Sequence, residues 1–121
     1  RWMAIANMRA GEIDHCINMA NAESCIYPLH GGGQWADPTG ARKAQAWLMQ
    51  YLEIDPKNPG ARWLLNVVHM ADGTFPEGVP PEYRLPEEAW KGGVESPRFT
   101  RAMLPGLSHV VRPATTSASE R

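Results

Sequence analysis

The sequence lacks the features that mark membrane proteins and several large classes of enzyme. It has no apolar run of about 18 residues, the least that a membrane-spanning helix needs. It has no Cys-x-x-Cys pair, no Gly-x-Ser-x-Gly element and no glycine-rich loop followed by Lys-Ser or Lys-Thr. We therefore expect no membrane insertion and predict no cofactor. Whether the chain is an enzyme stays open, with a non-enzymatic role favoured.

An excess of either charge is also missing. The 121 residues include 12 Lys and Arg against 13 Asp and Glu, which gives a net charge of −1. The basic residues are scattered along the chain rather than clustered. Such a chain has no field that would draw nucleic acid or an anionic membrane surface. We expect a protein partner or self-assembly, and no nucleic acid.

Cysteine is scarce: its two copies are Cys16 and Cys25, with eight residues between them. A disulfide between them would close a small loop and stabilise the fold by about 2–3 kcal/mol. The intervening residues are mostly small or polar, so the bond would hold a weakly packed segment. We predict this disulfide. The alternative is a pair of buried, reduced thiols in a cytosolic protein.

The stretch 41–73 carries the clearest structural pattern. Two helical runs are separated by a break that contains Pro56 and Pro59, and Gly73 ends the second run. Asn58 is suited to cap the second run, with Pro59 at its first position. The predicted fold class is therefore mostly α, built on a helical hairpin of about the length of one tetratricopeptide (TPR) unit. A single hairpin of this kind cannot bury its apolar face alone and needs neighbours.

The apolar positions of the hairpin predict how its helices pack. Steps of three and four residues place one stripe on the first helix. Its members are Ala41, Ala44, Trp47, Leu48, Tyr51 and Leu52. We expect Trp47 and Trp63 in the core, since they lie where the two helices would meet.

Two short helices are predicted before the hairpin. The first covers residues 2–10 and ends at Gly11, a residue type favoured just after a helix. The second covers residues 12–19. Three glycines follow at 31–33, where we expect positive φ angles or a close approach of the backbone to the hairpin.

Proline dominates the sequence after Thr74, where seven of the 11 prolines lie. Such a segment cannot be a regular helix. We predict an extended strap laid over the helices, with one helical turn at residues 87–90, and a domain that spans residues 1–90. Residues 91–121 are predicted as an extended tail, partner-bound or disordered, with a strand near residues 98–100.

Four aromatic residues in the irregular segments are the predicted partner-binding residues: Trp35, Trp90, Tyr83 and Phe75. Aromatic side chains dominate the energetics of interfaces. The alternative is that these rings cover the hairpin from outside.

Histidine supplies the candidate metal ligands. His15 lies beside Cys16, and His30 precedes the three glycines. Imidazoles suit copper, zinc or iron. Two ligands are fewer than the three or four that such sites use, so a metal at His15 and His30 is a minor alternative.

Several short motifs resemble a known family. They are residues 21–26 (NAESCI), residues 31–33 (GGG) and residues 61–66 (ARWLLN). They resemble the N-terminal TPR-like region of bacterial FG-GAP/ASPIC-UnbV proteins, relatives of cartilage acidic protein, over about residues 5–86. In that family this region precedes a calcium-binding β-propeller. Here residues 96–100 resemble the start of the propeller, and no propeller sequence follows them.

The resemblance implies export to the periplasm or the extracellular space, which agrees with a disulfide. The chain begins at Arg1 with no signal-peptide pattern, so we expect a mature or partial product. The predicted function is an exported protein–protein interaction or adaptor module, an accessory subunit of a larger assembly. The alternatives are a metal- or redox-associated enzyme subunit and a structural building block of an extracellular assembly.

Overall fold

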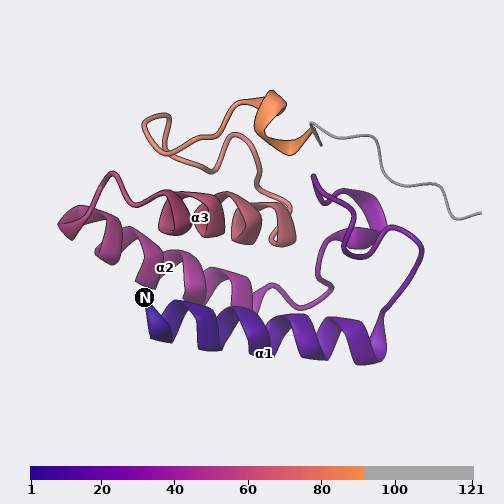
Figure 1. Ribbon diagram of the computed structural model, residues 1–121. Coiled ribbons are helices and arrows are strands. Elements are labelled where there is room, and N and C mark those ends of the chain that lie inside the picture. The colour runs from indigo at the N-terminus through magenta and orange to yellow at the C-terminus, as the bar shows by residue number, and fades with distance from the viewer. Residues whose placement is uncertain (92–121) are drawn as a thin grey trace, which may run out of the picture.

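The computed structural model describes residues 1–91, and this part of the chain is helical (Figure 1). It contains three α-helices, α1 (Trp2–Asn18), α2 (Thr39–Ile54) and α3 (Pro59–Ala71). Two 3-10 turns, η1 (Gly31–Gly33) and η2 (Glu87–Trp90), lie in the connecting segments. No strand occurs between residues 1 and 91. The prediction of a mostly α fold is confirmed for this range. The predicted strand near residues 98–100 and almost all of the predicted tail lie outside it.

The predicted helical hairpin is present as α2 and α3. Asn58 caps α3: its Oδ1 accepts a hydrogen bond of 3.0 Å from the backbone N–H of Ala61, and Pro59 is the first helical residue. Gly73 follows α3 with a φ of +73°, which glycine adopts without steric cost. These local signals fixed both ends of α3 because each satisfies backbone groups that a helix terminus leaves unpaired.

Helix α1 is longer than predicted and continuous. The sequence suggested two helices with a stop at Gly11, but α1 runs from Trp2 to Asn18 without a break. Glycine at this position leaves space for the ring of Trp35 and does not terminate the helix, because a Cβ on Gly11 would lie 2.5 Å from that ring. A Cβ on Gly40 would lie 2.7 Å from the carbonyl oxygen of Asn7 and 3.0 Å from the Cα of Gly11. The two helices therefore touch backbone to backbone at Gly40, where a larger residue has no room.

Helix α2 is the middle layer of the fold. It packs against α1 on one side and α3 on the other. The buried residues of α2 are Ala41, Ala44, Leu48 and Leu52, as the stripe predicted. Trp47 and Trp63 differ from the prediction, since they are 41% and 42% exposed. Alanine is buried at the positions between helices, and these rings lie at the edges of the packed faces.

The segment after α3 turns back over that helix, on the side away from α2 (Figure 1). Asn66 lies in the apolar run of α3 and holds this segment in place. Its Nδ2 donates to the carbonyl oxygen of Tyr83 at 2.9 Å, and its Oδ1 accepts from the N–H of Leu85 at 3.0 Å. Val79, which belongs to this segment, is fully buried. As predicted, this segment lies over the helices and has one helical turn, η2, but residues 74–84 form successive turns rather than an extended chain.

The three glycines form a tight turn against the preceding loop, not against the hairpin. Gly31 has a φ of +51°. The N–H of Gly32 donates to the Glu23 carboxylate at 2.6 Å, and its carbonyl oxygen accepts from Asn21 at 2.7 Å. A Cβ on Gly33 would lie 2.7 Å from the carbonyl oxygen of Glu23. The expected positive φ is therefore present at Gly31, whereas the close approach of the backbone is to the loop at Glu23 and not to the hairpin.

Candidate functional site

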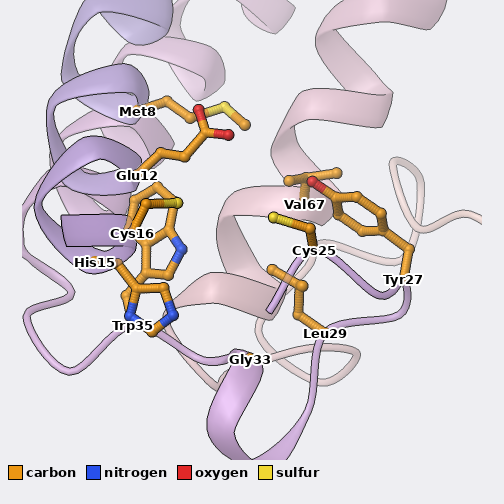
Figure 2. A pocket seen from close by; sticks show the side chains of 10 residues that line it. All are labelled: Met8, Glu12, His15, Cys16, Cys25, Tyr27, Leu29, Gly33, Trp35 and Val67. Carbon is orange, nitrogen blue, oxygen red and sulfur yellow. The ribbon is translucent and has the colours of Figure 1, made fainter. Parts of the chain in front are cut away.

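A hollow between α1 and the loop that follows it brings the two cysteines together (Figure 2). It is lined by Met8, Glu12, His15, Cys16, Cys25, Tyr27, Leu29, Gly33, Trp35 and Val67. The sulfur atoms of Cys16 and Cys25 point toward each other across it. The disulfide predicted between them is nevertheless wrong for this structure, because both are free and exposed thiols. The loop is held instead by the hydrogen bonds of Glu23 and Asn21.

The environment of Cys16 does not make it a nucleophile. Desolvation raises the pKa of its thiol above the ordinary value, and the nearby Cys25 and Glu12 raise it further. A catalytic cysteine needs the opposite, a thiolate favoured by positive charge or a helix N-terminus. The Cys16 thiol in the hollow is therefore not activated.

The two candidate metal ligands do not share a site. His15 is buried, with 6% of its surface exposed, and it lines the hollow. Its Nε2 lies 3.5 Å from Ser24 Oγ, and its Nδ1 has no hydrogen-bond partner within residues 1–91. His30 is exposed, and its Nδ1 is 2.9 Å from the carbonyl oxygen of Pro28. Within the described range, no three His, Cys, Asp or Glu side chains are grouped as metal ligands would be.

The predicted partner-binding aromatics mostly face the fold itself. Trp35 is in the core at 9% exposure, where its ring fills the space that Gly11 leaves open. A side chain this buried is a packing residue, so the docking role expected for Trp35 gives way to a structural one. Phe75, Tyr83 and Trp90 are partly buried and pack against the core, and a partner-binding role for them stays a prediction.

Trp90 also belongs to a cluster of aromatic rings, and the sequence analysis did not predict that these rings lie together. Its centroid lies 6.4 Å from the rings of Tyr27 and Trp63 and 6.1 Å from Phe75. Offset or edge-on contacts at these distances are favourable beyond the area that they bury. The cluster ties the loop before η1, helix α3 and the turn η2 to one another, which is a structural role.

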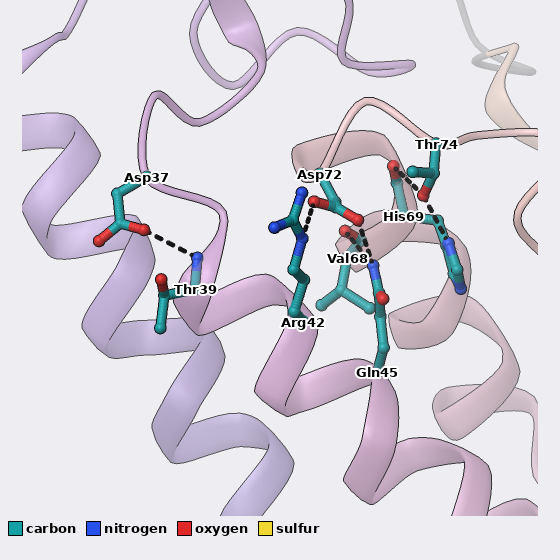
Figure 3. A network of polar contacts seen from close by, with 8 residues as sticks. All are labelled: Asp37, Thr39, Arg42, Gln45, Val68, His69, Asp72 and Thr74. Carbon is teal, nitrogen blue, oxygen red and sulfur yellow. Dashed lines mark hydrogen bonds and ion pairs between the residues drawn. The ribbon is translucent and has the colours of Figure 1, made fainter.

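A polar network beside the hairpin is also structural (Figure 3). Arg42 of α2 donates from Nε to Asp72 at 2.8 Å, and Gln45 donates to the same carboxylate at 3.3 Å. Nδ1 of His69 lies 2.7 Å from Thr74 Oγ1. These contacts join α2 to the end of α3 and fasten the start of the strap.

The most unusual surface of the described chain is the outer face of α1. Positions at alternating steps of three and four residues carry only apolar side chains there. We call this set the outer seam: Met3, Ala6, Ala10, Ile13 and Ile17. All five are exposed, with 53% of Met3, 50% of Ile13 and 76% of Ile17 open to solvent. Trp2, at the start of the same face, is 81% exposed.

The outer seam lies opposite the face that α1 packs on α2. The inner face consists of Ala4, Met8, Gly11 and His15, which are buried or half-buried. The same helix therefore carries an apolar stripe on each side, and residues 1–91 cover only one of them. Sequence reasoning missed the seam because a helix end placed at Gly11 divided it into unrelated pieces. The alternation of three and four steps was the signal that could have shown it.

Two further findings concern membrane spans and similarity to known proteins. Among the helices of residues 1–91, none combines the length and apolar character that a bilayer crossing requires. Comparison of the chain with family models, curated proteins and solved structures gives no match. The outer seam is thus the feature of residues 1–91 that best indicates a function.

Proposed function

We propose that this chain is a protein–protein interaction module, a subunit or adaptor of a larger assembly, which docks an apolar α-helix of a protein partner on the outer seam of α1. The observation that supports the proposal is the exposure of the seam. Solvent-exposed helix faces normally carry charged or polar side chains. A contiguous apolar stripe on a monomer instead marks an interaction surface.

A helix is the partner that suits the shape of the seam. The seam runs along most of α1, a helix of 17 residues, and is one side chain wide. Its middle positions, Ala6 and Ala10, are small, so another helix backbone could approach closely there. Helix-on-helix packing of this kind is how TPR-like repeats bury the faces that one hairpin leaves open. The TPR-like nature of the fold is part of the same proposal.

Export remains part of the proposal through the resemblance to the FG-GAP/ASPIC-UnbV region. The cysteines give it no additional support, since they are not bonded to each other. The balanced charge of the chain favours a protein partner over nucleic acid.

Photo-crosslinking in native cells tests the proposed function. A benzophenone amino acid replaces Ile13 on the outer seam or, as a matched control, Gln50, an exposed residue of α2. We expect a covalent protein adduct from position 13 and none from position 50, because only the seam would touch a partner. No adduct at position 13, or equal adducts at both positions, would contradict the proposal.

A further inference from the structure

We infer that the partner helix is α1 of a second copy of this chain, paired with the first in parallel and in register. The inference rests on the proposed function and names the partner of that same surface. It is carried by the spacing of the seam and by the charges on its two edges.

The spacing of the outer seam is that of a two-stranded coiled coil. Steps of three, four, three and four residues from Met3 to Ile17 place these side chains at alternating a and d positions of a heptad. Met3, Ala10 and Ile17 are then a residues, and Ala6 and Ile13 are d residues. A seam with this spacing fits an identical seam, because each side chain meets its own equivalent across a two-fold axis.

The edges of the seam decide between the two possible directions. Arg9 directly precedes the a residue Ala10, so it is a g residue on one edge of the seam. Asp14 directly follows the d residue Ile13, so it is an e residue on the opposite edge. In a parallel, in-register pair a g residue faces the e residue five positions later in the other helix. Arg9 of each copy then faces Asp14 of the other, which gives two opposite-charge pairs. An antiparallel pair would instead bring the g edges together and place Arg9 near Arg9.

The present partners of these charges are exchangeable. Arg9 forms an ion pair with Glu12 one turn away, and Asp14 accepts a hydrogen bond of 2.8 Å from Asn18. Both contacts lie on the exposed surface, where such interactions contribute little to stability. Pairing across a dimer would therefore displace nothing that the monomer needs.

The fold is already arranged for this contact. Helices α2 and α3 lie on the inner side of α1, so within residues 1–91 nothing stands between two seams (Figure 1). Helix α1 is ordered by packing on α2, so a second copy would not have to fold it. Two seams of this length would bury on the order of 1,000 Å² in total, at the lower edge of specific interfaces. The inference is a reversible dimer with a dissociation constant on the order of micromolar.

Sedimentation equilibrium of the full chain, from about 1 to about 300 µM, tests the inference. We expect a monomer–dimer equilibrium for the wild-type chain. Ile13→Arg should raise the dissociation constant at least about 30-fold, because two charges enter the symmetric interface. Gln50→Arg, on exposed α2 surface, should leave it unchanged. Circular dichroism of each variant verifies that the fold is retained.

A charge exchange tests the direction of the pair. Arg9→Glu alone should weaken the dimer about 5-fold, and the double variant Arg9→Glu/Asp14→Arg should restore it to within about 2-fold of wild type. An antiparallel dimer would not be weakened by Arg9→Glu, since that change would only exchange a repulsive Arg–Arg contact for an equally repulsive Glu–Glu contact. Unweakened association of the single variant therefore overturns the parallel arrangement.

The remaining outcomes separate this inference from the proposed function. A wild-type chain that stays monomeric over the whole concentration range overturns the inference. If benzophenone at position 13 then crosslinks only to a different protein, the inference fails and the docking function stands. If it crosslinks to nothing, both fail.

Discussion

The two faces of α1 carry similar apolar residue types, but one face is buried in the fold and the other is exposed to solvent. The inner face places Ala4, Met8 and Gly11 toward the core, and a Cβ added at Gly11 would lie 2.5 Å from the ring of Trp35. The outer face places Ala6, Ala10 and Ile13 in solvent. Burial on the first face stabilises the fold, whereas exposure on the second contributes nothing to it. An apolar stripe is thus evidence of packing only when a neighbouring element covers it, and otherwise points to a partner.

The inner face should be the more easily broken, and the largest effect is expected at the helix crossing. In Gly40→Ala the added Cβ would lie 2.7 Å from the backbone oxygen of Asn7, so α1 and α2 must separate. We expect a loss of about 3 kcal/mol in unfolding free energy, measured by urea denaturation. Gly60→Ala is the matched control, because its Cβ would meet nothing closer than 3.5 Å. Equal effects of the two substitutions would refute the close crossing.

The same substitution on opposite faces gives the next largest contrast. Ala4 is 1% exposed, so Ala4→Leu should destabilise the fold by about 2 kcal/mol through overpacking. Ala10 lies on the outer seam, and Ala10→Leu should change stability by less than about 0.5 kcal/mol. Thermal and urea unfolding of both variants measure the difference. If Ala10→Leu is the more damaging, the assignment of inner and outer faces is reversed.

The first turns of α1 and α3 provide a smaller contrast. The side chain of Asn58 accepts a hydrogen bond from the first turn of α3, whereas Arg1 makes no side-chain hydrogen bond to α1. We expect Asn58→Ala to cost about 1 kcal/mol and Arg1→Ala to cost less than about 0.5 kcal/mol. Urea denaturation of the two variants checks this. A costless Asn58→Ala would show that the cap is not needed.

The smallest effect should come from His69 on α3. Burial lowers the pKa of its imidazole below the ordinary value of 6.5, and the nearby Asp72 opposes the shift. The unfolded chain therefore binds a proton first as the pH falls, and stability declines below about pH 6.5. Stability is fully present above that pH. His69→Gln should flatten this part of the pH–stability profile, and an unchanged slope would assign it to another group.

The sequence predicted those parts of the fold that local chemistry decides. The hairpin was recognisable because Asn58 and Pro59 are residue types that start a helix, and Gly73 is a residue type that ends one. The buried stripe of α2 followed from periodicity, except at Trp47, which is 41% exposed. The strap was predictable because proline excludes regular helix over that segment.

The parts that were not predictable depend on which element packs against which. Gly11 is a plausible helix end until the ring of Trp35 is known to occupy the space beside it. Trp35 has the character of a surface anchor until α1 covers it. Cys16 and Cys25 do lie across from each other, as their spacing indicated, but proximity does not decide whether a bond forms. The outer seam became visible only after α1 proved to be a single helix.

The outer seam of α1 should be covered in the working assembly, and residue-level footprinting measures this directly. Ile17 and Ile54 are matched reporters, since 76% and 84% of their surfaces are exposed in the isolated chain. Carbene labelling would be compared between the dilute full-length chain and its native assembly, with peptide mass spectrometry as the readout. The account predicts strong protection of Ile17 in the assembly and unchanged labelling of Ile54. Equal labelling of Ile17 in both samples would contradict it.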